Sequence, residues 1–320
     1  MLGAALSLIV ALGLDRAFGE PRAPWHPVVW MGRALGAMGQ RIAPVRDQAE
    51  PRFDGVRWAL GALGWSAGAL VVLAVAWAAQ TALSTLNPWW AALLTGLLLK
   101  PLMSWRLLRE EVLAVESALS QSLEQGRERL SWLVSRDTRA LDAVAVRESA
   151  IESLAENLSD SVVAPLFWFL IAGLPGAALY RWANTADAMW GYDGLRRDTD
   201  GTPRDWTWAG QWAARVDDAL SWVPARLTAA LLLFAGACLA LRALWREARR
   251  TPSPNSGWPM AALALALNLR LRKPGVYTLN ADGRAPGPAD TTAAIVLAGR
   301  ALAVGLVLLG AVVLFTWSMA

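Results

Sequence analysis

Two apolar stretches of membrane-spanning length constrain this chain more than any other feature. Residues 58–86 carry no charged side chain, and residues 293–317 carry only Arg300. A hydrocarbon core about 30 Å thick is crossed by roughly 20 apolar residues in a helix. Shorter apolar runs cover 1–14, 89–99, 161–180 and 227–241, and 1–14 is short for a span. The chain is therefore predicted to be an integral membrane protein.

The composition supports this reading and excludes several other classes. Apolar residues make up 55% and charged residues 18% of the chain, against roughly 25% charged in ordinary soluble domains. Nineteen tryptophans fit the level where hydrocarbon meets water. Because Cys238 is the only cysteine and His26 the only histidine, a disulfide scaffold and a structural zinc site are both excluded.

Turn signals and arginines indicate the topology. Asn87-Pro88 and Gly173-Leu174-Pro175-Gly176 break apolar runs without any charge, whereas the long polar connections hold nearly all the arginines, which should face the cytoplasm. We predict a hairpin over 58–99 and a hairpin or re-entrant pair over 161–190. The basic segment 242–292 does not fit simple alternation. The expectation is an all-α, polytopic membrane protein, with four to six membrane segments, cytoplasmic motif loops and a single domain over residues 1–320.

The basic residues are almost all of one type. Of 30, all but Lys100 and Lys273 are arginine, and the net charge is +4. Codon usage of the host is one explanation; the other is bidentate capture of phosphate or carboxylate by guanidinium groups. No nucleic-acid-binding motif accompanies them, so we expect anionic substrates or membrane lipid as partners and no nucleic acid.

A proline-rich polar segment follows the first apolar run. Three prolines between positions 21 and 27 should prevent a helix and fix a bent, extended loop. The segment is either a plain membrane-surface loop or a rigid loop that directs four polar side chains at one anionic ligand, namely Asp15, Arg22, His26 and Arg33.

The most informative polar cluster is a ladder of acids. Glu148, Glu152, Glu156 and Asp160 recur every four residues, which stacks them on one helix face. Like charges at this spacing destabilise a helix by roughly 0.2–0.5 kcal/mol per pair. Something must share that face: either arginines from another segment, or a divalent cation such as Mg²⁺, which takes oxygen ligands and bridges to substrate phosphates. We expect Glu148 to remain solvated helix surface.

Three further polar clusters lie downstream. Asn184 and Asp187 repeat the Asn-x-x-Asp spacing of Asn157 and Asp160, a weak signal alone. Arg215-Val216-Asp217-Asp218 and Pro224-Ala225-Arg226 precede an apolar run and form either a surface ion-pair cluster with a snorkelling Arg226 or a binding site. Ser253-Pro254-Asn255-Ser256-Gly257 specifies consecutive turns whose N–H groups could bind an anion.

Common nucleotide and hydrolase motifs are absent. The sequence has no G-x-x-x-x-G-K-[ST], no strand-borne G-x-G-x-x-G and no G-x-S-x-G. Any nucleotide chemistry must therefore use a site without these motifs.

Taken in order, these clusters resemble the adenosylcobinamide-phosphate synthase family, membrane enzymes of cobalamin biosynthesis. The matching residues cover nearly the whole chain and are Gly19-Glu20-Pro21-Arg22, His26-Pro27-Val28, Gly32-Arg33, Ser135-Arg136-Asp137-Thr138, Glu152, Ala155-Glu156-Asn157, Asp160, Ala164-Pro165-Leu166-Phe167, Asn184-Thr185, Asp187, Met189, Gly191-Tyr192, Ala214-Arg215, Asp217-Asp218, Pro224-Ala225-Arg226-Leu227-Thr228 and Ser253-Pro254-Asn255-Ser256-Gly257-Trp258-Pro259. Two features depart from the pattern. Glu20 stands where the family commonly has Asp, and 193–210 is unlike the usual short sequence.

The resemblance implies an ATP-dependent amide ligation at the cytoplasmic (inner) membrane. A propionate carboxylate of adenosylcobyric acid would be joined to the amine of an aminopropanol phosphate, or a related amino-alcohol phosphate, with ATP as co-substrate and Mg²⁺ as metal. Neither zinc nor haem is implied. The partners are these substrates and membrane lipid; a homo-oligomer or a complex with other corrinoid-pathway proteins stays open.

The resemblance also suggests residue roles. The expected catalytic residues are Glu152, Glu156, Asp160 and His26, and the expected metal ligands are Glu156, Asp160 and Asp187. The expected substrate-binding residues are Glu20, Arg22, Arg33, Asp137, Thr138, Asn157, Asn184, Tyr192, Arg215, Asp217, Asp218, Arg226, Ser253 and Asn255.

Two other function classes are alternatives. A transporter would be expected to contain inverted repeats with paired broken helices, and only the Asn-x-x-Asp repeat is found. A membrane sensor related to β-lactamase regulation is the second. A lipid-headgroup transferase lacks its usual Asp and Arg spacing here.

Overall fold

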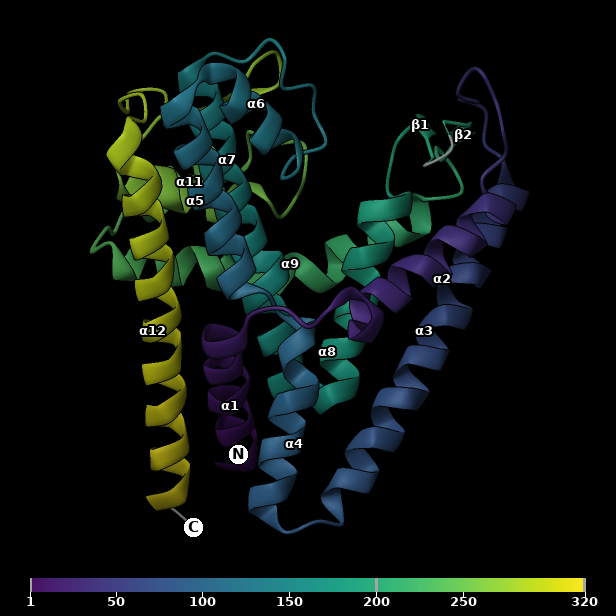
Figure 1. The fold of residues 1–320 in the computed structure, drawn as a ribbon, viewed down its shortest axis with the longest axis vertical. Coiled ribbons are helices and arrows are strands. Elements are labelled where there is room, and N and C mark those ends of the chain that lie inside the picture. Colours follow the sequence, from purple (N-terminus) through teal and green to yellow (C-terminus); the bar gives the residue numbers. More distant parts are fainter. Residues whose placement is uncertain (1, 199–200, 319–320) are drawn as a thin grey trace. The chain divides into compact units, whose positions relative to one another are not determined.

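The protein is built almost entirely of helices. The computed structural model describes residues 2–198 and 201–318. In chain order the elements are α1 (Leu2–Phe18), η1 (Ala23–Trp25), α2 (Pro27–Ile42), α3 (Gly55–Ser84), α4 (Pro88–Leu99), η2 (Lys100–Leu102), α5 (Trp105–Gln121), α6 (Leu123–Ser131), α7 (Ala143–Leu158), the π-helical turn η3 (Ser159–Val163), α8 (Ala164–Trp190), β1 (Leu195–Arg197), β2 (Pro203–Asp205), α9 (Gln211–Ala235), α10 (Leu241–Ala248), α11 (Gly257–Ala266), β3 (Leu271–Lys273), β4 (Tyr277–Leu279) and α12 (Pro288–Ser318) (Figure 1). The strands form two short antiparallel hairpins.

Five helical stretches in the described part of the chain are long and apolar enough to cross a membrane. They are Gly55–Ser84, Pro88–Gln121, Ala143–Trp190, Gln211–Ala235 and Pro288–Phe315. This confirms a polytopic helical membrane fold within the predicted range of four to six segments. The 17-residue α1 falls outside these five, in keeping with its short apolar run.

Both charge-free breaks form turns, as the sequence predicts. Between α3 and α4 the side chain of Asn87 accepts a hydrogen bond from the backbone N–H of Trp89, and Pro88 is the first residue of α4. In α8 the helix is interrupted at Ala172 and at Gly173, whose φ is 66°. A Cβ on Gly176 would overlap the carbonyl of Trp168, which shows that α8 folds back on itself. The predicted reversal of the chain within 161–190 is therefore confirmed, and it fits both a hairpin and a re-entrant pair.

The chain divides into two compact units that are interleaved in sequence. The first unit contains Met1–Ala5, Ser104–Ala164 and Ser221–Ala320, and the second contains Leu6–Met103 and Pro165–Leu220. Neither unit is a contiguous segment, because the chain passes between them within α1, between η2 and α5, and within α8 and α9. The prediction of a single membrane domain stays a prediction.

The first unit is organised around α7. This helix contacts α5, α6, α11, α12 and strand β3. Its Ile151, Leu154, Ala155 and Leu158 are wholly buried. Because neighbours cover several sides of α7, its polar residues are also removed from water.

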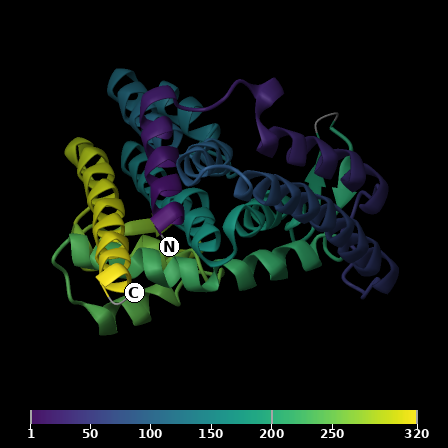
Figure 2. The same cartoon turned by 90° about the horizontal axis from the view of Figure 1, so that it is seen from below.

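The second unit has a core rich in tryptophan. Trp65, Trp182, Trp190 and Trp206 are buried together with leucine and isoleucine of α2 and with alanines of α3, α8 and α9. The indole N–H of Trp182 donates to the carbonyl of Trp65 at 3.1 Å, and that of Trp190 to the carbonyl of Leu35 at 3.2 Å, so these buried polar atoms are satisfied. Helix α2 lies along α3, as both Figure 1 and Figure 2 show.

Candidate functional site

The acidic ladder forms one buried face of α7. Glu148 is 0% and Glu152 3% exposed. The Nε of Arg272 donates to both carboxylate oxygens of Glu148, at 3.0 and 3.3 Å, and Nη2 of Arg136 donates to Oε2 of Glu152 at 2.8 Å. Arginines from other segments therefore share this face, which is one of the two alternatives left open by the sequence.

The expectation that Glu148 is solvated helix surface is wrong. The hairpin β3–β4 packs on α7, in contact through β3, and brings Arg272 over this carboxylate. Basic residues precede the turn of this hairpin, and Gly275 at the turn has a φ of 75°, a conformation that glycine adopts without strain. Burial of Glu148 thus depends on a segment more than one hundred residues away in the chain.

A small polar pocket opens beside Glu152, and we call it the α7 pocket. Its volume is about 180 Å³, and it is lined by Leu133, Val134, Ser135, Arg136, Ser149, Glu152, Ser153, Glu156, Asn157, Lys273 and Tyr277. Three separate segments meet here: the loop after α6, helix α7 and the hairpin β3–β4. The predicted site residues Glu152, Glu156 and Asn157 therefore share one pocket.

Two atoms of this pocket have unused hydrogen-bonding capacity. Oε1 of Glu152 and Nη1 of Arg136 are buried without a hydrogen-bond partner in the described structure. Buried polar atoms are normally paired, because an unsatisfied one costs about 1–3 kcal/mol. A ligand that supplies an acceptor to Arg136 and a cation or donor to Glu152 would remove that cost.

Lys273 and Tyr277 are pocket residues that sequence reasoning missed. They face each other across the β3–β4 register. Burial raises the pKa of the Tyr277 hydroxyl, and the nearby charge of Glu152 raises it further, so this phenol is neutral and remains a hydrogen-bond donor. The sequence offered only a weak indication of their role. Lys273 is one of two lysines in the chain, and it directly precedes the turn-forming pair Pro274-Gly275.

Other predicted residues of the first unit have varied surroundings. Asn157, which also lines the α7 pocket, donates from Nδ2 to the carbonyl of Ser153 at 3.0 Å, and Asp160 lies in the π-helical turn η3. Asp137 is exposed and bound by Arg139; hydrogen bonds from the side chain and backbone of Arg139 lower its pKa to about 2. Thr138 is buried.

Arg226 is held by protein groups. Its Nη1 donates to Oδ1 of Asn255 at 2.8 Å, and its Nη2 to the carbonyl of Pro254 at 3.1 Å. The guanidinium also lies over the rings of Trp222 and Trp258, at 4.3 and 4.6 Å from their centroids. Ser253 Oγ accepts from the backbone N–H groups of Asn255 and Ser256, both at 3.2 Å. The predicted residues Arg226, Ser253 and Asn255 thus form one cluster.

A second acidic cluster lies in the second unit, where α8 and α9 meet. Nδ2 of Asn184 donates to Oδ1 of Asp217 at 3.5 Å, and the charges of Asp187 and Asp218 are close enough to act on Asp217. The two motif blocks 184–187 and 215–218 are therefore brought together. Arg215 is exposed on α9, and Tyr192 lies 3.9 Å beneath the guanidinium of Arg196.

The block 215–218 does not precede a membrane helix but belongs to one. Helix α9 runs continuously from Gln211 to Ala235 with Pro224 inside it. The sequence reading, which began the apolar run at 227, is corrected here because the charged residues occupy the first half of the same helix.

The proline-rich segment also differs from a single rigid loop. Asp15 belongs to α1, and α2 begins at Pro27 and contains Arg33. Arg22 and Arg33 are exposed, whereas Asp15 is buried. Prolines at first helical positions are tolerated because their missing N–H would be unbonded there in any case, which explains why Pro27 starts a helix instead of preventing one.

Instead, the N-terminal motif contributes to a buried charge cluster. Nζ of Lys100 lies 2.8 Å from Oε2 of Glu20 and 3.4 Å from Oδ1 of Asp15, and Nε2 of His26 lies 3.0 Å from the same Glu20 oxygen. We call Asp15, Glu20, His26 and Lys100 the Lys100 cluster. Nδ1 of His26 accepts the backbone N–H of Val28 and so caps α2.

The predicted metal ligands are not gathered in one group. Among residues 2–198 and 201–318, no group of three or more His, Cys, Asp or Glu side chains is placed to hold a metal ion. Glu156 and Asp160 belong to the first unit and Asp187 to the second. The assignment of these three residues stays a prediction.

Comparison with known proteins places the chain in a family. Residues 8–315 match the model of the CobD/Cbib protein family. The "Probable cobalamin biosynthesis protein CobD" of Methanothermobacter thermautotrophicus is 40% identical over 283 residues, which is 85% of each chain. The "Cobalamin biosynthesis protein CobD" of Chromobacterium violaceum is 43% identical over 272 residues (84% of this chain, 82% of the relative), and that of Rhodobacter capsulatus 37% identical over 330 residues (98% and 99%). No solved structure matches. The chain therefore belongs to the CobD/Cbib protein family.

Proposed function

We propose that this protein acts in cobalamin biosynthesis as an ATP-dependent amide synthase. It would join a propionate carboxylate of adenosylcobyric acid to the amine of aminopropanol phosphate or a related amino-alcohol phosphate. Relatives that cover most of the chain are named cobalamin biosynthesis proteins, which supports the pathway. The transporter and sensor alternatives have no comparable support.

The observation that carries the proposal is the composition of the α7 pocket. Basic, acidic and neutral donor groups line the same small volume, through Arg136, Lys273, Glu152, Glu156 and Tyr277. Phosphoryl transfer depends mainly on positioning and on stabilising charge at phosphate oxygens. A pocket with two cations beside two carboxylates can bind phosphate oxygens and, through the acids, a cation that accompanies them.

The reaction would proceed in two balanced steps. An oxygen of the corrinoid carboxylate attacks the γ-phosphorus of ATP, the bond from that phosphorus to the bridging oxygen breaks, and ADP leaves. The neutral amine then attacks the acyl carbon, inorganic phosphate leaves, and the amine loses one proton to a base as the amide forms. Arg136 and Lys273 would hold the transferred phosphoryl group, and Tyr277 would donate a hydrogen bond to it.

The pocket offers a limited fit for Mg²⁺. This cation usually binds one or two protein carboxylates and completes its shell with substrate phosphates and water. The buried Oε1 of Glu152, which has no hydrogen-bond partner, and the pocket-lining Glu156 fit that pattern; Asp160 and Asp187 do not line the pocket. When bound, Mg²⁺ would neutralise charge on the phosphate oxygens. Glu152 is held in place by Arg136, so its carboxylate is oriented in advance.

His26 has a structural task in addition to its predicted catalytic role. Its Nδ1 caps α2, and its Nε2 contacts Glu20. Both ring nitrogens are therefore engaged, and catalysis by His26 stays a prediction. The same holds for substrate binding by Asp217, Asp218, Asn184, Arg215 and the arginines of the N-terminal motif.

Direct synthesis tests the function. The full chain, reconstituted in lipid nanodiscs, is incubated with adenosylcobyric acid, aminopropanol phosphate and Mg-ATP, and the products are separated by liquid chromatography and identified by mass spectrometry. We expect adenosylcobinamide phosphate and ADP in equal amounts, with neither formed when one substrate is omitted. Absence of the amide, or substrate uptake by proteoliposomes without product, would overturn the proposal.

We also propose that the active face is cytoplasmic, on a multi-pass protein of the cytoplasmic (inner) membrane. The motive is the concentration of arginine in the connecting segments. The test uses a variant in which serine replaces Cys238 and cysteine replaces Glu124, an exposed residue of α6. We expect no labelling by an impermeant maleimide until the cells are opened.

A further inference from the structure

A second polar pocket adjoins the β3–β4 hairpin, and we call it the hairpin pocket. Its volume is about 540 Å³, and the charged residues that line it are Asp142, Glu148, Arg250, Arg272 and Lys273. They come from the start of α7, the segment after α10 and strand β3, all within the first unit. None of the three cations was among the predicted site residues.

The hairpin connects this pocket with the α7 pocket. In the β3–β4 register Arg272 lies opposite Thr278, and Lys273 lies opposite Tyr277. Successive side chains of a strand point to opposite faces, so these two pairs belong to opposite faces of the hairpin. Lys273 and Tyr277 line both pockets, whereas Arg272 and Thr278 line the hairpin pocket and not the α7 pocket. A ligand bound at Arg272 therefore lies next to side chains of the α7 pocket.

The two arginines of the hairpin pocket are anchored through their Nε atoms. Nε of Arg272 donates to both carboxylate oxygens of Glu148, and Nε of Arg250 lies 3.0 Å from Oε2 of the buried Glu247. Nη1 of Arg250 also donates to the carbonyl of Thr278 at 3.5 Å. Because the side chains of Arg272 and Arg250 are 39% and 44% exposed, their outer N–H groups are open to a ligand. Guanidinium groups oriented in this way suit phosphate oxygens.

Both acids of the hairpin pocket already have partners in the protein. Glu148 is bound by Arg272, and the charge of Arg270 also acts on it. Oδ1 of Asp142 accepts the backbone N–H of Ala145 at 2.7 Å and so caps α7. The charge of Lys273 acts on Glu152, but its ammonium makes no hydrogen bond or ion pair with the residues that the structure describes. The pocket is therefore suited to an anion and offers no carboxylate for a metal ion.

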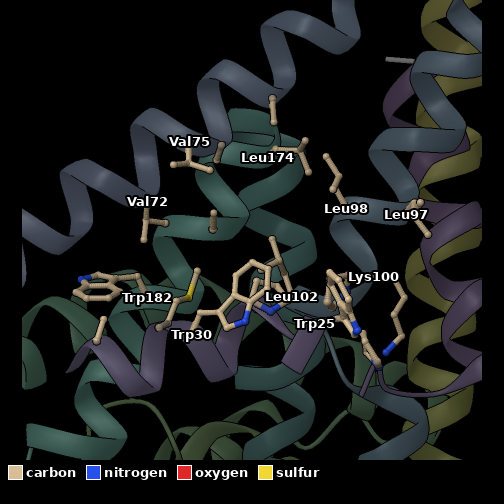
Figure 3. A pocket seen from close by; sticks show the side chains of 18 of the residues that line it. Trp25, Trp30, Val72, Val75, Leu97, Leu98, Lys100, Leu102, Leu174 and Trp182 are labelled. Carbon is tan, nitrogen blue, oxygen red and sulfur yellow. The ribbon is translucent and has the colours of Figure 1, made fainter. Parts of the chain in front are cut away.

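The hairpin pocket differs from the larger cavity of the second unit. That cavity has a volume of about 1090 Å³ and lies between α3 and α4, with mostly apolar side chains such as Val72, Val75, Leu97 and Leu98 on its walls (Figure 3). A buried anion without several donors is costly, and apolar walls supply none. Of these two cavities, the hairpin pocket is therefore the one that suits a phosphorylated ligand.

We propose that the hairpin pocket binds the phosphate group of the amino-alcohol phosphate, the substrate that supplies the amine. Arg250, Arg272 and the hydroxyl of Thr278 would donate to the phosphate oxygens. The amine would extend past Tyr277 into the α7 pocket, where the carboxylate is activated. This assignment rests on the proposed amide ligation, which requires the amine and the activated carboxylate to meet.

Two features favour the phosphate ester over ATP in this pocket. A volume of about 540 Å³ lies within the range of sites for small molecules, roughly 300–1,000 Å³. The phosphates of ATP are accompanied by Mg²⁺, which usually binds one or two protein carboxylates, and the acids that suit this cation line the α7 pocket. A phosphate monoester needs only the cations.

Binding of the phosphate ester alone tests the proposal. The full chain in lipid nanodiscs is titrated with aminopropanol phosphate in a calorimeter, without corrinoid or ATP. We expect binding by the parent and roughly tenfold or more weaker binding by Arg250→Gln, the size expected for one hydrogen bond to a charged group. Absence of binding by the parent, or parental affinity in Arg250→Gln, would overturn the proposal.

Arg249→Gln is the matched control. Arg249 is the neighbouring arginine and is also exposed, but it lies over the ring of Trp245 and does not line the hairpin pocket. We expect parental affinity in this variant, and equal weakening in both arginine variants would overturn the assignment to the pocket. If Arg250→Gln does not elute as a folded protein, Thr278→Val replaces it, with binding about two- to tenfold weaker than in the parent. Parental affinity in Thr278→Val would then overturn the proposal.

A competition arm separates the two phosphate-bearing substrates. A non-hydrolysable ATP analogue with Mg²⁺ should leave the affinity for aminopropanol phosphate, and its dependence on Arg250, unchanged. Displacement of the ester by the analogue would assign the hairpin pocket to nucleotide phosphates and overturn the proposal.

The synthesis assay separates failure of the site from failure of the proposed function. Arg250→Gln should raise the KM for aminopropanol phosphate about tenfold and leave the KM for ATP unchanged. Arg250-dependent binding of the ester without any amide product would overturn the amide ligation and support the site. Amide synthesis with a parental KM for aminopropanol phosphate in Arg250→Gln would overturn the site alone.

Discussion

The α7 pocket and the Lys100 cluster are both buried and charged, yet their charges are balanced in opposite ways. On α7, Glu148 and Glu152 each have an arginine of their own, and Lys273 and Tyr277 add further donors to the pocket. In the Lys100 cluster a single lysine serves two carboxylates, and the adjoining walls are apolar. In the first region each of these acids is paired with its own guanidinium, whereas in the second one ammonium is shared by two acids.

This difference bears on which region is prepared for a ligand. In the α7 pocket Nη1 of Arg136 is buried without a hydrogen-bond partner, and a guanidinium N–H favours an anion such as phosphate. In the Lys100 cluster the charged groups contact one another, which is the arrangement of a structural ion-pair cluster.

Removal of the lysine should have the largest effect. Lys100→Met removes the ammonium that contacts both Asp15 and Glu20, and breaking a buried ion pair in this way costs about 3–5 kcal/mol. The free energy of unfolding, measured by denaturant titration in mixed micelles, should fall by this amount. Retention of parental stability would show that the Lys100 ion pairs do not stabilise the fold.

Arg272→Met is the matched variant on the α7 side. Its target Glu148 is fully buried, but the Arg272 side chain is 39% exposed, so water can enter when it is removed. We expect a smaller loss than for Lys100→Met. A larger loss of unfolding free energy in Arg272→Met than in Lys100→Met would contradict this expectation. Arg139→Met, which removes an exposed pair with Asp137, should leave stability unchanged.

Glu156→Gln should have the next largest effect, on activity. The change keeps the shape of the side chain but removes a charge from the α7 pocket. If Glu156 helps to hold Mg²⁺, the Mg²⁺ concentration for half-maximal synthesis should rise about 10–100-fold. Glu124→Gln, on the exposed surface of α6, is the control. If turnover and its Mg²⁺ dependence were both unchanged in Glu156→Gln, the metal would have to be bound elsewhere. The acidic residues of α7 would then serve only as ion-pair partners of arginines.

Arg226→Lys should have a moderate effect. The fork of Arg226 joins Asn255 and Pro254 and stacks on two indoles, and an ammonium cannot reproduce this geometry. We expect about 1–2 kcal/mol less stability, and a raised KM for one substrate if the residue also binds an anion. If the KM values for all substrates equal those of the parent, the role of Arg226 is only to hold the turns of residues 253–259 in place.

Features encoded locally could be predicted from the sequence. Asn87-Pro88 and Gly173–Gly176 act through their own backbone preferences, so both helical hairpins were predictable. The positions of apolar runs likewise predicted a helical membrane protein. The motif order over the whole chain also predicted the family.

Features that depend on distant segments could not be predicted. Nothing near Glu148 shows that Arg272 covers it, and nothing near Lys100 shows that Asp15 and Glu20 meet it. Tryptophan misled in part: the count suggested interfacial rings, but Trp182 and Trp190 are 2% and 1% exposed and pack in a core. The polar residues of these sites were visible in the sequence, whereas their partners required the fold.

The smallest expected effect concerns Asp205, a charge held outside the membrane segments by hydrogen bonds. Burial opposes its ionisation, but bonds from Thr207 and the backbone of Glu50, with the charge of Arg46, lower its pKa below the ordinary value. Because the folded pKa is depressed, the stabilisation is complete above the unfolded value of about 3.9 and is lost as pH falls through the folded value. Hydrogen exchange should therefore show the 44–54 and 202–208 segments less protected at pH about 3 than at pH 7, by roughly 1 kcal/mol or less.

Asp205→Asn should remove this pH dependence, while Asp47→Asn, at an exposed position, should keep it. An equal acid-induced loss of protection in Asp205→Asn and in the parent would show that groups other than Asp205 control the acid sensitivity of this region.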